Sequence, residues 1–273
     1  MSRLSSYIKE DNFTQSGGRS VPIKFEQFDQ ILNTHCKDAL KGDPIYRGIA
    51  KGKWDPYLSI DPSKYIRKSQ FTENWYMLIL QLLPKWRKFP NLSKSVICTT
   101  SEIDAGSWGE LYQVYPYDGS KIGIAPEEHF WASFPDYLQP QQGMANLNAL
   151  LHIIAYNAGI KDINRDETDP SKMKKFLNEI DLYLDRKTLI NNVISDYEHR
   201  FMGDLKRLLE KYRDDEIQRL LDVFSVVLDT KGFELKTIGD KLSYGKQVWT
   251  EGKCIMKKLS TFGGFITLDD YEL

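Results

Sequence analysis

Three short polar segments, far apart along the chain, contain residue types that bind and position charged ligands. The first is Tyr46-Arg47-Gly48, the second is Cys98-Thr99-Thr100-Ser101 with Ser95 before it, and the third begins at Gln247. An arginine on a rigid strand presents a planar set of donors to anionic oxygens, and hydroxyls on a neighbouring strand can orient a bound group. Each segment is common by itself, because threonine is an ordinary strand residue. Their order along the chain carries the information.

Sequence motifs for several other chemistries are absent. The sequence contains no Walker phosphate loop, no dinucleotide-binding G-x-G-x-x-G, no zinc-protease HExxH and no hydrolase G-x-S-x-G. His129 stands beside Glu127 and Glu128, but one histidine and two adjacent acids do not form a metal site without further ligands. We therefore predict no metal centre.

The ordered set resembles the R-S-E class of ADP-ribosyltransferases. In that family an early strand carries an arginine, a later strand reads Ser-Thr-Ser, and a final strand carries Glu-x-Glu or a close variant. This chain offers Arg47, then Thr99-Thr100-Ser101, then Gly245-Lys246-Gln247-Val248-Trp249 followed by Gly252. The resemblance covers about residues 45–134 and 244–257. A helical block before the last strands departs from the family pattern.

The resemblance implies that NAD is bound as a substrate. In this resemblance Arg47 would hold NAD, and the hydroxyls would orient the nicotinamide ribose. The implied binding residues are Tyr46, Arg47, Gly48, Ser95, Thr99 and Thr100. Tyr76 is a candidate to cover the nicotinamide ring, although its place on an apolar helix favours a core position.

Cleavage of the nicotinamide–ribose bond builds positive charge on the sugar, which a nearby carboxylate stabilises. Gln247 stands where the resemblance puts that carboxylate. Either the protein has lost catalysis and kept a binding cleft, or Gln247 replaces a glutamate to silence a toxic enzyme. Glu128, or Glu127 beside it, is a further source of the charge. The catalytic candidates are therefore Arg47, Thr99, Gln247 and Glu128.

Two functions follow from the resemblance, so whether the chain is an enzyme stays open at this point. One is a mono-ADP-ribosyltransferase that modifies a host macromolecule, either a protein or another target. The other is a non-catalytic binding protein on the same fold, such as a phage inhibitor of a host or defence protein, and Gln247 favours it. Nucleic acid is disfavoured as a partner, because 37 basic and 38 acidic residues leave a net charge of −1.

Hydrophobic patterns place the polar segments in an α+β fold. They predict strands over residues 45–49, 95–100, 111–115, 121–124, 246–250 and 253–257, with 111–124 and 246–257 each forming strand, turn and strand. They predict helices over residues 25–40, 74–83, 145–157, 170–184, 187–212 and 216–228. Asp169 and Asp215 are the expected N-caps of the helices that follow them.

The expected architecture is an ADP-ribosyltransferase-like split β-sheet core with a mainly helical insertion. Residues 1–140 would begin the core, residues 141–240 would form the insertion, and residues 241–273 would add a strand pair that completes the core. Three widely spaced cysteines indicate a reducing compartment. No apolar run approaches the ~20 residues of a membrane span. We expect a cytoplasmic protein without a membrane partner, in the host cytoplasm if a phage encodes it.

Overall fold

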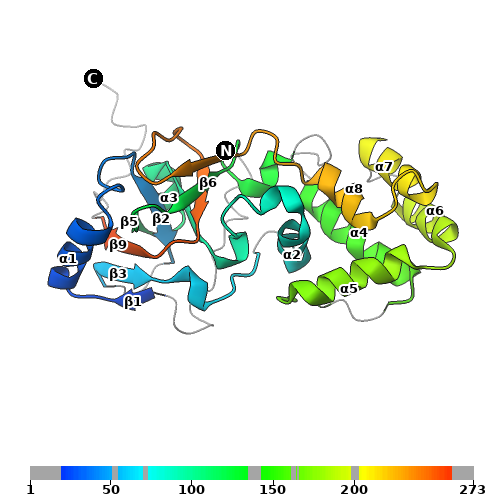
Figure 1. Ribbon diagram of the computed structural model, residues 1–273, viewed down its shortest axis with the longest axis horizontal. Coiled ribbons are helices and arrows are strands. Elements are labelled where there is room, and N and C mark those ends of the chain that lie inside the picture. Colours follow the sequence, from blue (N-terminus) through cyan, green and yellow to red (C-terminus); the bar gives the residue numbers. More distant parts are fainter. Residues whose placement is uncertain are drawn as a thin grey trace, which may run out of the picture.

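The computed structural model describes residues 20–50, 55–69, 73–134, 143–160, 164, 166–197 and 203–259. Figure 1 shows an elongated molecule with the sheet at one end and a group of helices at the other. Within these residues nine antiparallel strands form one sheet and are accompanied by eight α-helices. The predicted α+β class is confirmed.

The strands follow the order β1-β3-β9-β5-β2-β4-β8-β6-β7 across the sheet. Their bounds are β1 Ser20–Pro22, β2 Ile45–Ile49, β3 Tyr57–Ile60, β4 Val96–Thr99, β5 Glu110–Pro116, β6 Lys121–Ile124, β7 Glu234–Thr237, β8 Gln247–Thr250 and β9 Cys254–Lys258. The sequence predicts six of them. It misses β1, β3 and β7, which lie at or next to the edges of the sheet.

One long antiparallel ribbon, bent in its middle, replaces the two local strand pairs that the sequence predicts. Strand β5 pairs with β9, and β6 pairs with β8. At the bend the Tyr117 N–H donates to the Lys253 carbonyl oxygen at 2.9 Å. Gly252 is needed here, because a Cβ atom would lie 2.2 Å from the Ser120 Oγ. The prediction of two hairpins was wrong because alternation marks a strand but not its partner.

The sheet divides where β2 meets β4. A single backbone pair, Tyr46 opposite Thr99, connects these strands, whereas β2 pairs with β5 along its whole length. Strand β4 is in turn fully paired with β8. The result is two half-sheets, β1-β3-β9-β5-β2 and β4-β8-β6-β7, that share the bent ribbon and meet again at the pair Tyr46–Thr99.

The helices are α1 Phe25–His35, α2 Asn74–Leu82, α3 Glu102–Ser107, α4 Gly143–Asn157, α5 Pro170–Asp181, α6 Arg186–Tyr197, α7 Gly203–Arg213 and α8 Leu220–Val227. Helix α1 packs on one face of the sheet, where Phe28 joins a core that includes Ile45, Val114 and Met256. Helices α4 to α8 gather at the other end of the molecule (Figure 1).

Two helix predictions need correction and one cap is confirmed. The single helix predicted over 187–212 consists of α6 and α7, and residues 198–202 between them lie outside the described residues. Asp169 caps α5, since its Oδ1 accepts the Ser171 N–H at 2.8 Å. Asp215 does not cap α8, which begins later, after Arg219. Asp215 instead has a φ of 66° and pairs with Arg186.

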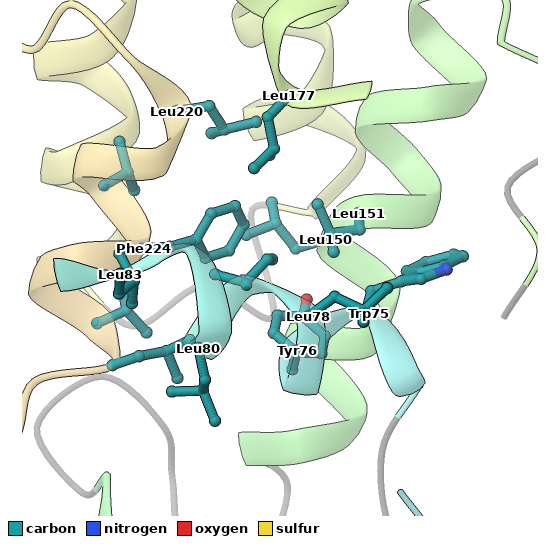
Figure 2. Packing of buried hydrophobic residues seen from close by; sticks show 14 of the residues in the cluster. Trp75, Tyr76, Leu78, Leu80, Leu83, Leu150, Leu151, Leu177, Leu220 and Phe224 are labelled. Atoms are coloured by element: carbon teal, nitrogen blue, oxygen red, sulfur yellow. The ribbon is translucent and has the colours of Figure 1, made fainter. Parts of the chain in front are cut away.

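Helix α2 packs with the later helices α4, α5 and α8, although it precedes α4 by some 60 residues. Figure 2 shows side chains of α2 packed among those of α4, α5 and α8, with Leu78 near Leu150 and Phe224. The same core extends to Trp249 on β8, whose Nε1 donates to the Pro90 carbonyl oxygen at 2.8 Å. The helical block and one face of the sheet therefore share a continuous core.

Candidate functional site

The three polar segments predicted from the sequence lie on three adjacent strands. Tyr46 on β2 is opposite Thr99 on β4, and Thr99 is opposite Gln247 on β8. Residues directly opposite each other across antiparallel strands project to the same face. These three residues therefore form a row that crosses the division of the sheet.

Arg47 lies on the other face of the sheet, because successive side chains of a strand alternate. Its side chain is buried, and its Nη1 donates to the Ile97 carbonyl oxygen on β4 at 2.5 Å. Its neighbours include Cys98 and Cys254, whose thiols have a raised pKa because of burial, an effect that the charge of Arg47 partly offsets. The guanidinium thus links β2 to β4 where their backbone pairing stops.

Gly48 is explained by packing within the protein. A Cβ atom at this position would lie 2.2 Å from the Ala105 carbonyl oxygen and 2.6 Å from the Trp108 Cβ. Both atoms belong to α3 and its C-terminal end, so α3 can lie against β2 only if residue 48 lacks a side chain. The geometry supplies this role for Gly48 without a cofactor.

The hydroxyls of Ser95 and Thr99 are buried and already hydrogen-bonded inside the protein. Ser95 Oγ donates to the Asn91 carbonyl oxygen at 2.7 Å. Thr99 Oγ1 accepts the Ser101 N–H at 3.1 Å, and the Thr99 side chain is 2% exposed. Ser95 comes directly before β4 and Thr99 ends it, and neither residue borders the cavity described below.

Thr100 connects the end of β4 to the loop before β8. Its Oγ1 donates to the Ser243 carbonyl oxygen at 2.8 Å and accepts the Lys246 N–H at 2.9 Å. These two bonds place the loop beside α3. Of the three predicted hydroxyl residues, Ser95, Thr99 and Thr100, Thr100 is the one that borders the cavity described below.

Gln247 is held by the loop that follows β6. Its side-chain oxygen accepts the N–H of Phe130, and its backbone oxygen accepts the Ala125 N–H at 2.9 Å. The same loop carries Glu127 and Glu128, both exposed, and the Gln247 N–H donates to the Glu127 backbone oxygen at 3.5 Å. None of these three residues borders the cavity.

Tyr76 lies in the core of the helical block, as its helix position favoured. The residue is fully buried, and its ring meets those of Trp131 and Phe224 edge to face, with centroids 6.5 Å and 6.0 Å away. Figure 2 shows it among the apolar side chains of α2. Tyr76 is therefore a core residue and does not border the cavity described below.

A cavity of about 670 Å³ opens beside the row, between β2, α3 and the loop before β8. Its volume lies in the range of small-molecule sites, about 300–1,000 Å³. The polar residues around it are Asp43, Tyr46, Thr100, Glu102, Lys241 and Tyr244. Sequence reasoning found two of these, Tyr46 and Thr100. It missed the others because loop residues and the first turn of a short helix follow no periodic pattern.

The cavity has a negative balance of charge. Its lining residues include two carboxylates, those of Asp43 and Glu102, and one ammonium, that of Lys241. Burial raises the pKa of Tyr46, and the nearby negative charge of Glu102 raises it further. Tyr244 also lines the cavity, and its hydroxyl lies 3.3 Å from the Ser101 Oγ.

No family model, curated protein or solved structure matches this chain. In the described part of the chain, histidine, cysteine and acidic residues do not gather in groups of three or more that could hold a metal ion. The described helices include none with the length and apolar character to cross a bilayer. The function is therefore inferred from the site itself.

Proposed function

We propose that this protein has an ADP-ribosyltransferase-type core and binds a protein partner without transferring ADP-ribose. One observation carries the proposal. Gln247 occupies the position where the resemblance requires a carboxylate, and its amide oxygen accepts the N–H of Phe130. A neutral amide in that bond does not supply the negative charge that stabilises an oxocarbenium-like transition state.

The strand arrangement supports the family assignment. The three strands that carry the resemblance are widely separated in sequence, yet they are neighbours in the order β2-β4-β8. Tyr46, Thr99 and Gln247 stand in one row at the place where the sheet divides. The neighbouring placement of these three strands supports the resemblance, whereas the Arg47 side chain lies on the face opposite the row.

The side chains around the row favour binding over NAD cleavage. The guanidinium of Arg47 is engaged on the opposite face of the sheet, where it donates to the Ile97 carbonyl oxygen. The cavity offers a dinucleotide pyrophosphate one cation, Lys241, against the carboxylates of Asp43 and Glu102. Like charges repel in such a partly enclosed site, so an anionic ligand is disfavoured.

The rim of the cavity suits a protein surface. Ile103 and Tyr244 both border the cavity and are 77% and 71% exposed. Large apolar and aromatic side chains of this kind are enriched where proteins meet, because contact removes them from water. Two of them at the mouth of one charged cavity indicate a partner that covers the rim as well as entering the space.

A silenced enzyme is the second candidate, and the row through Gln247 favours it. A glutamate at position 247 could accept the same N–H from Phe130, so the substitution needs no rearrangement of the loop. In that form NAD would be the substrate and a host macromolecule in the cytoplasm the acceptor.

The test compares the unsubstituted chain with Gln247→Glu in assays of NAD hydrolysis and auto-ADP-ribosylation, after unfolding curves show that both are folded. We expect neither protein to turn over NAD or to gain thermal stability from millimolar NAD. Turnover by Gln247→Glu alone would overturn the proposal in favour of the silenced enzyme. A Gln247→Glu, Glu128→Gln double variant then shows whether Glu128 shares the role.

A further inference from the structure

We infer that the cavity beside Tyr46 recognises a basic side chain of a protein partner, and that Glu102 selects it by charge. This inference rests on the proposed binding function and names the chemistry of the partner group. An arginine guanidinium is the best match, because it combines a positive charge with a flat face and an apolar stem.

Three elements that are distant in sequence build the recognition wall. Tyr46 comes from β2, Glu102 from the first turn of α3, and Tyr244 from the loop before β8. The contact between the Tyr244 hydroxyl and the Ser101 Oγ, at 3.3 Å, holds the loop against the start of α3. A cation between two aromatic side chains and a carboxylate gains cation–π attraction together with a charge-assisted hydrogen bond.

Glu102 is the carboxylate best able to bind a ligand. Among the described residues, no hydrogen bond or ion pair engages its side chain, whereas Asp43 accepts the Leu242 N–H at 2.7 Å. Glu102 is exposed at the cavity, and its charge reaches the Tyr46 hydroxyl, whose pKa is raised by burial first and then by Glu102. The negative charge of Glu102 therefore acts on Tyr46 in the wall of the cavity.

The rim argues for a side chain presented by a protein over a free small cation. A small ion would leave Ile103 and Tyr244 in water, whereas a partner surface around an inserted side chain would cover both. Leu111 is a buried apolar residue on the cavity wall and can pack against the stem of the inserted residue.

The experiment uses two probes of similar shape whose backbone termini are blocked and uncharged, N-acetyl-arginine methylamide and its citrulline counterpart. Citrulline keeps the outline of arginine but carries no charge. In a titration of the ¹⁵N-labelled full chain we expect the arginine probe to shift the amide resonances of Thr100 and Gly106, which border the cavity. The citrulline probe should leave them unchanged. Equal binding of the two probes would overturn the inference.

The variants isolate the charge. Glu102→Gln should weaken binding of the arginine probe by about tenfold, the loss expected for one charge-assisted hydrogen bond. Glu26→Gln is the matched control, because it removes the same charge from an exposed residue of α1 outside the cavity and should leave binding unchanged. An unchanged affinity in Glu102→Gln, or an equal loss in both variants, would refute selection by Glu102.

The two proposals can fail separately. If Gln247→Glu cleaves NAD while the arginine probe still binds in a Glu102-dependent way, the proposed function fails and this inference stands. If NAD is neither bound nor cleaved and the arginine probe does not shift Thr100 or Gly106, the inference is overturned and the binding function needs another surface.

Discussion

Replacing Gly48 with alanine should destabilise the protein, because the new methyl group has no room. Its Cβ would lie 2.2 Å from the Ala105 carbonyl oxygen and 2.6 Å from the Trp108 Cβ. One is a backbone atom and the other is a Cβ atom, and neither can move by a side-chain rotation. Helix α3 must therefore shift away from β2. Overpacking of this kind costs about 1–3 kcal/mol. The reduced freedom of the unfolded chain offsets roughly 0.4–1 kcal/mol of this.

The expected net loss is therefore about 1–2 kcal/mol in the free energy of unfolding. For a chain of this size it corresponds to a fall in the melting temperature of roughly 2–8 °C. Gly106→Ala is the matched control, since Gly106 lies in α3 and an added Cβ meets no heavy atom within 4 Å. That variant should be neutral or stabilised by up to about 1 kcal/mol, because alanine favours a helix over glycine.

Urea unfolding followed by tryptophan fluorescence measures both variants against the unsubstituted chain. If Gly48→Ala unfolds at the same urea concentration as the unsubstituted chain, the packing of α3 on β2 does not explain the glycine. If the stability of Gly48→Ala is unchanged but binding of NAD is lost, Gly48 allows NAD to approach the backbone closely, as the family resemblance implies.

Gln247→Leu should lower the free energy of unfolding by about 1–3 kcal/mol, because it leaves the N–H of the buried residue Phe130 without its acceptor. Gln247→Glu keeps an acceptor there, so equal losses in the two variants on chemical denaturation would show that this bond does not matter. A second prediction concerns alkaline pH: burial, and then the charges of Glu110 and Asp55, raise the pKa of Tyr112 from 10.0 to about 12. The contribution of the Tyr112 hydroxyl to stability is complete below pH 10.0 and is lost as the pH rises through about 12. The melting temperature of Tyr112→Phe should therefore fall less between these pH values than that of the unsubstituted chain. Melting temperatures of both proteins across the window measure this, and parallel curves would contradict the assignment.

Local sequence signals predicted the elements that carry the site. Alternation and β-branched residues predicted the strand that begins at Ile45 and the strand that ends at Thr250, and both are present as β2 and β8. The aspartate before a proline predicted the start of α5, because its side chain can accept the first free N–H groups of a helix. These features depend on neighbours in sequence, so one chain is enough to find them.

The position of a side chain across the sheet could not be predicted in the same way. Arg47 was a candidate ligand-binding residue, but the pairing of β2 with β5 and β4 puts it on the face opposite Tyr46. For Tyr76 the apolar helix favoured a core position, and the packing of α4 and α8 around it decided that position. Each outcome depends on residues far away in the chain.

The sequence by itself determined the α+β class, most strand and helix positions, and the presence of an amide at position 247, because these follow from residue type and local periodicity. The tertiary structure decided which segments are neighbours. It joined the 111–124 and 246–257 regions into one bent ribbon and brought Glu102 and Tyr244 to the same cavity. Strand pairing and loop packing depend on the burial of two segments against each other, and the sequence of one segment does not identify the other.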